Sequence, residues 1–365
     1  MPKIVTVIGA RPQFIKASAV SRALQSAEQL SELLIHTGQH FDSNMSEVFF
    51  SELAMPVPKY NLGVHGGQHG AMTGQMLEGI ERILVDEKPD VVLVYGDTNS
   101  TLAGALAAAK LHIPVAHVEA GLRSFNIRMP EEINRILTDR ISTWLFTPTE
   151  AAVKHLLSEG VAADKIVPVG DVMYDVALHF GARVSATGAA LSRLGLASGG
   201  YVLATVHRAE NTDVPARLEV IVAALMATAS KLPVVWPLHP RTRGVLQRHA
   251  LLDKLAASGA RLIEPVGYLE MMQLEKHAAL VVTDSGGVQK EAYFLQVPCV
   301  TMRDETEWLE LVEAGWNRLA PPDNPEAVTA AILDALGTSG REVSLYGSGD
   351  AADKIVARLV ADLRN

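Results

Sequence analysis

The chain has 365 residues, of which 48% are hydrophobic and 20% charged, and its formal net charge is −9. This composition is typical of a globular protein and excludes a disordered one, and the length favours two domains because single cores stop growing near ~250–300 residues. The acidic balance argues against a nucleic-acid partner, although a few local cations can still hold a small anion.

No apolar run approaches the ~20 residues that span a bilayer. The N-terminus enters a strand-like segment, Lys3–Gly9, rather than a secretory leader. We therefore expect a cytoplasmic protein without a membrane partner. The single cysteine, Cys299, lies in a short apolar run, so it is expected to be a buried strand residue and excludes an intramolecular disulfide.

Short apolar runs alternate with helical patterns, which is typical of strands in a parallel sheet that is buried on both faces. The strands expected in the first half are Lys3–Gly9, Leu33–His36, Val91–Tyr95, Pro114–Val118, Trp144–Thr147 and Ile166–Val169. The helices expected there are Thr101–Lys110, Glu131–Ile141 after Pro130, and Glu150–Glu159 with Thr149 as its cap and Gly160 at its end.

The second half repeats this alternation after Gly181–Gly200, whose Gly, Ala and Ser content predicts a boundary loop. The expected strands are Tyr201–Val206, Val234–Leu238, Leu262–Pro265, Leu280–Thr283 and Cys299–Met302, and the expected helices are Thr306–Ala314, ended by Gly315, and Ala351–Leu363. The sequence thus predicts an α/β fold of two Rossmann-like, doubly wound domains facing a cleft. We place residues 1–172 in the first domain and 173–350 in the second, with helix 351–365 packing back on the first.

A first candidate site follows the first strand, where the chain reads Gly9-Ala10-Arg11-Pro12-Gln13-Phe14-Ile15-Lys16. Pro12 can begin a helix, so Arg11 and Lys16 would flank a helix N-terminus. Backbone N–H groups, the helix dipole and two cations together suit a phosphate. The alternative is a pair of solvated basic side chains on a surface turn.

Carboxylates follow successive elements of the same half. Asp97 comes after Val91–Tyr95, Glu119 comes after the next strand, and Glu131 opens the following helix. Parallel strands deliver their carboxyl ends to one edge of a sheet, where the ligand crevice lies. Each residue alone could be structural, as a helix cap, an arginine partner or a helix-start residue. Together they predict acid–base chemistry, because like charges at close range favour proton uptake.

In the second half, His207 and Arg208 follow one strand and His239 follows the next. This placement could neutralise a pyrophosphate, although a lone histidine at a strand end would more often be a satisfied polar residue. After Leu280–Thr283 the chain reads Asp284-Ser285-Gly286-Gly287-Val288-Gln289-Lys290-Glu291 at a helix start. This run predicts a second anion cradle, with Glu291 able to accept hydrogen bonds from a ribose.

Two other features predict no site. His65 and His69 lack the cysteine or carboxylate companions of a metal site, and two glycines between them disfavour a helix. Ser285 lacks both a nucleophile-elbow motif and an obvious base.

Six motifs together resemble those of the non-hydrolysing UDP-N-acetylglucosamine 2-epimerases, in the family's order and over nearly the whole chain. They are Gly9-Ala-Arg11-Pro-Gln-Phe-Ile-Lys16, Gly96-Asp97-Thr98, His117-Val-Glu119-Ala-Gly-Leu-Arg123, Pro130-Glu131-Glu-Ile-Asn-Arg135, His207-Arg-Ala-Glu-Asn211 and Thr283-Asp-Ser285-Gly-Gly-Val-Gln289. The resemblance implies a glycosyltransferase-B-like fold, a homodimer without metal or redox cofactor, and inversion at C2 of a UDP-linked 2-acetamido sugar.

The same resemblance implies the site residues. Positions of catalysis and substrate contact in the family match Arg11, Lys16, Asp97, Glu119, Glu131, Arg135 and His207. Contacts to the UDP-sugar would also include Arg208, His239, Tyr268, Met271, Ser285, Gly286, Gly287 and Glu291.

The chain departs from the family pattern near the second cradle. Where the family commonly reads Thr-Glu-Arg-Pro-Glu, this chain reads Thr306-Glu307-Trp308-Leu309-Glu310, so the arginine's role is not carried over to Trp308. Lys290 begins a segment that is more acidic in the family, and Val266 and Met271 replace a Gln and a Phe near the uracil. With the motifs His36–Asp42 and Arg128–Asp139, these departures resemble a subgroup that acts on UDP-2,3-diacetamido-2,3-dideoxyglucuronate in surface polysaccharide synthesis.

The implied mechanism is departure of UDP from C1 with removal of the C2 proton, which gives a glycal, followed by re-addition. Two faces of C2 demand two acid–base groups, and Asp97, Glu119 and Glu131 are assigned to them collectively. Other interpretations share the architecture: a glycosyltransferase with a UDP-sugar donor, a non-catalytic UDP-sugar sensor, and a hydrolysing epimerase that releases free sugar.

Overall fold

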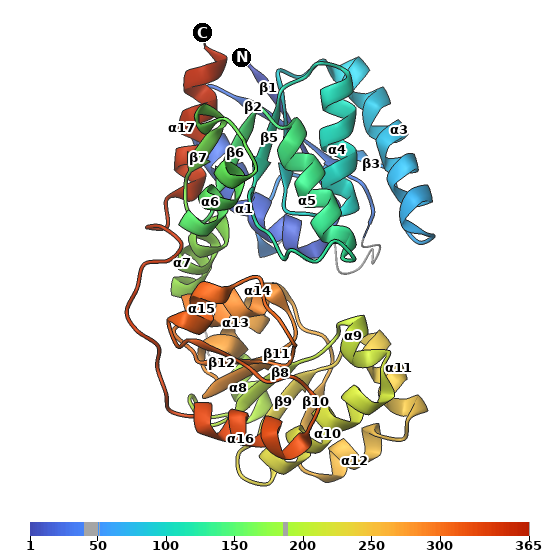
Figure 1. Ribbon diagram of the computed structural model, residues 1–365, viewed down its shortest axis with the longest axis vertical. Helices are drawn as coiled ribbons and strands as arrows, with labels where there is room; N and C mark the ends of the chain where they lie inside the picture. The colour runs from blue at the N-terminus through green and yellow to red at the C-terminus, as the bar shows by residue number, and fades with distance from the viewer. Residues whose placement is uncertain (40–49, 51, 185–188, 365) are drawn as a thin grey trace. The chain divides into compact units, whose positions relative to one another are not determined.

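The computed structural model describes residues 1–39, 50, 52–184 and 189–364. The chain divides into two compact units, Met1–Val176 with Ser344–Asn365, and Ala177–Val343 (Figure 1). It therefore crosses between the units twice. One crossing lies inside helix α7 (Val172–Val184), and the other precedes helix α17 (Ala351–Leu363).

The described part of the first unit holds a seven-stranded sheet whose neighbouring strands are all parallel. The spatial order is β3 (Tyr60–Asn61), β2 (Ser31–His36), β1 (Lys3–Ile8), β4 (Val91–Tyr95), β5 (Val115–Val118), β6 (Trp144–Thr147) and β7 (Ile166–Pro168). The strand order reverses between β1 and β4. Their carboxyl ends therefore flank the place where doubly wound sheets bind ligands.

Helices cover both faces of this sheet (Figure 1). They are α1 (Arg11–Ser26), α3 (His69–Glu87), α4 (Asn99–Lys110), α5 (Pro130–Ile141), α6 (Glu150–Ser158), the short 3-10 helix η1 (Ala163–Lys165) and α17. Helix α17 packs against α1, with Ile355 and Leu359 fully buried. Trp144 Nε1 of β6 also donates a hydrogen bond to Asp362 of α17 at 2.6 Å. The last helix is thus part of the first unit.

The described part of the second unit holds a six-stranded parallel sheet in the order β10 (Arg261–Ile263), β9 (Val234–Pro237), β8 (Val202–Thr205), β11 (Leu280–Thr283), β12 (Cys299–Thr301) and β13 (Asn317–Leu319). Here the order reverses between β8 and β11. The helices are α8 (Ala189–Leu194), α9 (Ala209–Thr212), α10 (Pro215–Ala229), α11 (Pro240–Arg248), α12 (Leu252–Ala257), α13 (Tyr268–Lys276), α14 (Gly286–Phe294), α15 (Leu309–Glu313) and α16 (Pro325–Ala335).

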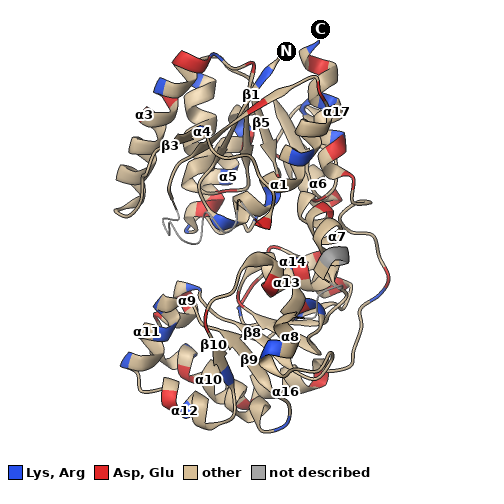
Figure 2. Ribbon diagram, turned by 180° about the vertical axis from the view of Figure 1, so that it is seen from behind, with Lys and Arg blue, Asp and Glu red and all other residues tan. Residues whose placement is uncertain are grey.

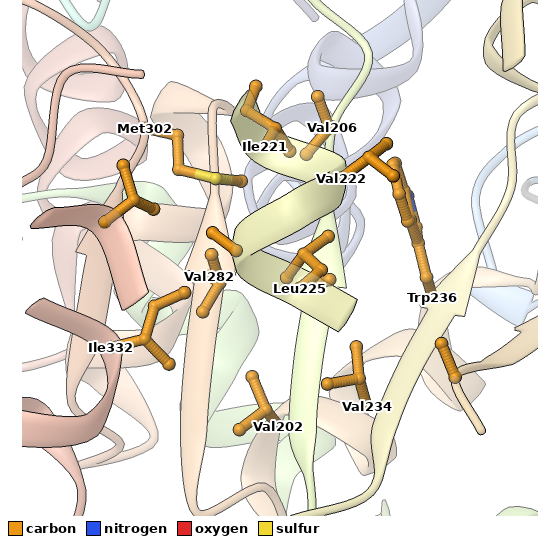
Figure 3. Close-up of a cluster of buried hydrophobic side chains, with 14 of the residues drawn as sticks. Val202, Val206, Ile221, Val222, Leu225, Val234, Trp236, Val282, Met302 and Ile332 are labelled. Carbon is orange, nitrogen blue, oxygen red and sulfur yellow. The ribbon is translucent and has the colours of Figure 1, made fainter. Parts of the chain in front are cut away.

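The second unit has its own hydrophobic core (Figure 3). Ile221 and Leu225 of α10 point onto the sheet, where they meet Val202 and Val282 of its central strands. Trp236 of β9 closes one side of this cluster and is almost completely buried. Strands whose side chains are buried on both faces explain the unbroken apolar runs in the sequence.

The predicted doubly wound α/β fold is confirmed, and every expected strand is present with ends within two residues. Strands β3 and β13 were not expected, because two and three residues leave no periodicity to detect. Cys299 is buried in β12 as expected, and burial raises the pKa of its thiol to about 12. Among the described residues, no helix combines the length and the apolar character needed to cross a membrane.

Two local predictions are wrong. The stretch Gly181–Gly200 is no simple loop, because its described part contains the end of α7 and helix α8, whose Ala190 and Leu191 are buried. The helix expected over Thr306–Ala314 begins only at Leu309. The Thr306 hydroxyl donates to Gln289 at 2.6 Å and accepts the N–H of Trp308 at 3.2 Å, so it is engaged ahead of the helix.

Candidate active site

The amino end of α1 is held by a buried glutamine. Gln13 Oε1 accepts the N–H groups of Gly9 at 2.8 Å and Ala10 at 3.0 Å. Its Nε2 donates to the carbonyl of Tyr95, at the end of β4, at 2.9 Å. Gln13 thus ties together the two strand ends at the reversal point, and Arg11 occupies the first helical position beside them.

Lys16 lies one turn further along α1 and forms an ion pair with Glu119 Oε2. Glu119 directly follows β5 and has a φ of 71°, a left-handed conformation that costs a glutamate roughly 1–3 kcal/mol. A Cβ on Gly96 would lie 3.2 Å from that carboxylate oxygen and 3.3 Å from Lys16 Nζ. The bare Gly96 therefore lets the pair approach the end of β4, and such strain is typical of functional sites.

Asp97 is oriented by helix α5. Asn134 Nδ2 donates to the Asp97 carbonyl at 2.9 Å, and Arg135 Nη2 donates to its carboxylate at 2.5 Å. Arg135 is buried and also pairs with Glu132 at 3.1 Å, whereas the Asp97 side chain is 30% exposed. Asp97 is therefore an accessible carboxylate with a fixed direction.

Glu131 lies on the exposed side of the first turn of α5, and the buried glutamate is its neighbour Glu132. The Glu132 carboxylate accepts the N–H groups of Ser124 at 3.0 Å and Phe125 at 2.8 Å. The structure thus brings Asp97, Glu119, Lys16 and Arg135 to one sheet edge and places Glu131 on the surface of the adjoining helix.

A buried polar chain that our sequence analysis did not single out runs beneath this edge. Arg123 Nη1 pairs with Asp139 Oδ2 at 2.7 Å, Asp139 Oδ1 contacts His117 Nδ1 at 2.7 Å, and His117 Nε2 contacts the Gly96 carbonyl at 2.8 Å. Burial alone would lower the pKa of Arg123, but Glu159 and Asp139 raise it, so the guanidinium stays charged. The available signal was a histidine inside the otherwise apolar strand β5.

In the second unit, Asp284 connects the strand ends at the reversal point. It is fully buried, and its carboxylate accepts the N–H groups of His207 at 3.1 Å and Arg208 at 3.0 Å. It also accepts from the Asn211 amide at 3.1 Å. The His207 imidazole remains about half exposed, with Nδ1 at 3.6 Å from Asp284. Asp284 thus fixes the turn that carries His207 and Arg208.

Helix α14 begins at the predicted Ser-Gly-Gly run, with Ser285 at its N-cap. A Cβ on Gly286 would lie 2.2 Å from Glu307 Oε1, so only a glycine fits without displacing that carboxylate. Glu307 pairs with Arg303 at 2.8 Å and Arg208 at 3.9 Å. Burial would raise the pKa of Glu307, but these two arginines lower it below its usual value.

The other residues that were predicted to contact the UDP-sugar differ in their exposure to solvent. His239 caps α11 by accepting the N–H of Arg241 at 3.3 Å and is exposed. Tyr268 is buried with its ring edge-on to Phe180, Met271 packs partly buried against the core, and Glu291 is buried. Helix α11 carries three arginines and no acidic residue, whereas the charged residue of α9 is Glu210 (Figure 2).

Two of the residues at which the chain departs from the family pattern, Lys290 and Trp308, contact each other. Lys290 Nζ lies 4.1 Å from the centroid of the Trp308 ring, and both side chains are buried. This contact is a cation–π interaction, which requires both the lysine ammonium group and the tryptophan ring.

Within the described ranges, no group of three or more His, Cys, Asp or Glu side chains could hold a metal ion. His65 Nδ1 contacts the Gly63 carbonyl at 2.8 Å, and His69 Nδ1 contacts the Asn99 amide at 3.2 Å. Of the motif His36–Asp42, the part from residue 40 onward lies outside the described residues.

Comparison with known proteins gives consistent matches. A family model described as UDP-N-acetylglucosamine 2-epimerase matches residues 22–360. The chain is 57% identical, over 98% of its length and 99% of the relative's, to a UDP-2,3-diacetamido-2,3-dideoxy-D-glucuronate 2-epimerase of Pseudomonas aeruginosa. The UDP-GlcNAc 2-epimerase of Methanocaldococcus jannaschii, crystallised with UDP-GlcNAc and UDP, superimposes with a TM-score of 0.91 at 46% identity, over 98% of this chain and 99% of that one. The enzyme from Neisseria meningitidis bound to UDP-GlcNAc has a TM-score of 0.90 at 31% identity, with both chains fully covered.

Proposed function

Because this chain belongs to the UDP-N-acetylglucosamine 2-epimerase family, we propose that it inverts C2 of a UDP-linked 2-acetamido sugar. The single observation that carries this function is the near-full-length match to epimerases. The resemblance inferred from the motifs is thereby confirmed at the level of the family.

The strand-end edge of the first unit would carry the proton chemistry. As the C1–O bond to UDP breaks, a carboxylate removes the C2 proton, and the C–H electron pair forms the C1=C2 bond of a glycal. UDP then re-adds through its oxygen at C1, and C2 receives a proton on the opposite face. Asp97, Glu119 and Glu131 are assigned to these steps collectively. The fixed, accessible Asp97 and the Lys16–Glu119 pair support this assignment.

The strand-end edge of the second unit would hold the nucleotide. The amino end of α14 at Ser285 and Gly286, with Arg208 and His207, offers N–H groups and positive charge to a leaving diphosphate. Glu291 would contact the ribose, Tyr268 and Met271 the uracil, and Arg11 and His239 the phosphates.

We further propose that the sugar is the 2,3-diacetamido-2,3-dideoxy-glucuronate form. Support comes from the higher identity to the Pseudomonas relative, 57%, than to the Methanocaldococcus enzyme, 46%. The Lys290–Trp308 stack also joins two of the positions at which the chain departs from the general family pattern.

The test is incubation with each nucleotide sugar in D₂O without an acceptor, followed by proton NMR. We expect the C2 epimer to appear with deuterium at C2, and faster with the diacetamido-glucuronate. Binding without exchange would indicate a sensor, turnover only with an acceptor a glycosyltransferase, and free sugar a hydrolysing enzyme. Faster exchange with UDP-N-acetylglucosamine would contradict only the substrate assignment.

We also propose a cytoplasmic homodimer that supplies a precursor for surface polysaccharide. Large apolar side chains exposed on α5 and just before it support a subunit contact; they are Phe125, Ile127, Ile133 and Leu137. Leu137→Glu should halve the molecular mass measured by sedimentation equilibrium. A wild-type chain that sediments as a monomer would contradict the dimer.

A further inference from the structure

We propose that His117 is a positioning residue for the proton-transfer edge, because it holds the Gly96–Asp97 turn through a hydrogen bond to the Gly96 carbonyl. This role rests on the proposed function and adds to it a residue that touches no substrate.

The hydrogen-bond partners of His117 hold its ring on both sides. The Gly96 carbonyl, 2.8 Å from Nε2, can only accept, so Nε2 carries a proton. Nδ1 lies 2.7 Å from Asp139 Oδ1. The other oxygen, Asp139 Oδ2, already accepts from Arg123 Nη1 at 2.7 Å and from the Gly121 N–H at 3.2 Å. Both ring nitrogens of His117 therefore lie within hydrogen-bond distance of oxygen atoms, Nε2 of the Gly96 carbonyl and Nδ1 of the Asp139 carboxyl group.

All three side chains of this network are buried. His117 is fully buried, and Asp139 and Arg123 are 2% and 5% exposed. Buried charges are costly unless they are paired and hydrogen-bonded. Arg123 meets that condition through a two-pronged contact with Glu159, at 2.7 and 2.9 Å. A network satisfied at every step keeps the imidazole in one position.

The Gly96–Asp97 turn depends on that position. Gly96 has a φ of 64°, in the region that only glycine enters freely. Its N–H donates to the Val118 carbonyl at 3.0 Å, so the bond from His117 fixes the other side of the same residue. The next residue, Asp97, is held by Asn134 and Arg135, which lie on α5 with Asp139. One helix thus fixes the turn both directly and through His117.

The first experiment separates positioning from stability. His117→Phe preserves bulk but has no donor, whereas His117→Gln keeps one donor for the Gly96 carbonyl. In His117→Phe we expect kcat to fall by about 10²-fold with KM changed less than about twofold, the loss typical of a ~1 Å misplacement. His117→Gln should recover part of kcat. The control is His155→Gln, since His155 contacts the Gly121 carbonyl at 3.0 Å and not Gly96, and its kcat should stay near wild type.

Unfolding midpoints are measured for all three variants. Wild-type kcat in a folded His117→Phe enzyme would overturn the proposal, as would a loss of kcat that only tracks the unfolded fraction. If His117→Phe does not fold, the comparison of His117→Gln with His155→Gln carries the same test.

The second experiment needs no turnover. In ¹⁵N-labelled protein, the His117 ring should show a slowly exchanging Nε2–H group that is absent from His117→Gln, and the Gly96 and Asp97 amide signals of that variant should shift. Absence of the Nε2–H signal, or unmoved Gly96 and Asp97 signals, would overturn the proposal. Failure of the proposed function is distinguishable, because it appears as absence of C2 exchange in the wild type with either nucleotide sugar.

Discussion

Gln13 and Asp284 play the same part in two different units. Each is a buried polar side chain that ties the ends of the two strands at the reversal point. Gln13 connects Gly9 to Tyr95, and Asp284 connects β11 to the turn at His207. Removing such a partner leaves buried N–H groups unsatisfied, which typically costs ~1–3 kcal/mol each. Both edges are therefore rigid where a ligand would approach.

The assignment of Asp97 predicts a specific kinetic defect. Asp97→Asn keeps an acceptor for Arg135 but cannot take a proton, so kcat should fall by about 10²–10⁴-fold while UDP-sugar binding changes little. Steady-state kinetics and calorimetric titration measure the two quantities. Asp90→Asn is the matched control, because Asp90 lies just before β4, at its opposite end, and accepts the Lys3 N–H at 2.7 Å. Normal turnover in Asp97→Asn would remove this residue from the mechanism.

Alanine substitutions at the two neighbouring glycines at the start of α14 should have opposite effects on the free energy of unfolding. An alanine Cβ at Gly286 would lie 2.2 Å from Glu307 Oε1 and push it away from Arg303 and Arg208, so we expect a loss of roughly 1–3 kcal/mol. At Gly287 the nearest atom is 3.9 Å away, and helix propensity favours alanine by up to about 1 kcal/mol. Urea unfolding compares Gly286→Ala with Gly287→Ala. Equal stability of the two variants would refute the clash.

At the scale of elements, the strands could be predicted from the sequence because their side chains are buried on both faces, which produces short, unbroken apolar runs. Strand β13 was not predicted; its polar Asn317 is buried and accepts a hydrogen bond from Thr301 at 2.8 Å, a pairing that no local pattern reveals. The start of α15 was misplaced for the same reason, since Thr306 is engaged by Gln289 on another helix.

The candidate site likewise has features that the sequence predicts and features that depend on tertiary packing. The approach of Asp97 and Glu119 to one edge follows from strand order alone. The pairs Lys16–Glu119 and His117–Asp139 join residues 103 and 22 positions apart, so they depend on tertiary packing. The sequence does not reveal that Glu132 is buried and Glu131 exposed, because the two glutamates differ only by their angle around α5.

Helix α17 is attached at its amino end by a carboxylate with an unusual titration. Asp175 accepts the N–H groups of Ala352 at 2.7 Å and Ala351 at 3.2 Å. Burial raises the pKa of Asp175 from 3.8 to about 6; these two bonds oppose the shift, and the charges of Asp171 and Asp350 add to it. The folded protein therefore binds this proton more tightly than the unfolded chain does. The stability it contributes is present below about pH 4 and is lost as the pH rises through 6.

Asp175→Asn removes this titration. Relative to the variant, the unfolding free energy of the wild type should fall by roughly 1–3 kcal/mol between pH 4 and 7. Asparagine keeps an acceptor oxygen for the N–H groups of Ala351 and Ala352 but does not titrate, so the pH-dependent part of the difference reports the titration of Asp175. Urea unfolding at several pH values measures it, with Asp353→Asn, on the exposed side of α17, as the control. If the unfolding free energy of the wild type relative to Asp175→Asn stays constant or grows with pH, the raised pKa of Asp175 is contradicted.

At the scale of the whole molecule, each unit has a sheet and a core of its own, with separate hydrophobic clusters. The proposed nucleotide contacts at α14 lie in the second unit. A ligand stabilises what it binds, by about 2.7 kcal/mol at a hundredfold excess over Kd. Ligand effects can therefore be assigned to one unit at a time.

UDP should slow amide hydrogen exchange mainly in β8, β11 and α14 of the second unit. Strands β6 and β7 of the first unit should change much less. Mass spectrometry of peptic fragments measures both, and uridine without phosphates is the control for the diphosphate contacts. Protection confined to the first unit would contradict the proposed nucleotide site.

The double crossing of the chain has a consequence for biosynthesis. The first unit is interrupted by the whole of the second, and its α1 surface is covered by Ile355 and Leu359 near the far end of the chain. While the protein is being translated, the nascent first unit leaves the ribosome with this apolar surface uncovered. This surface can be covered only after α17 has emerged. Chaperones therefore have a long interval in which to bind it.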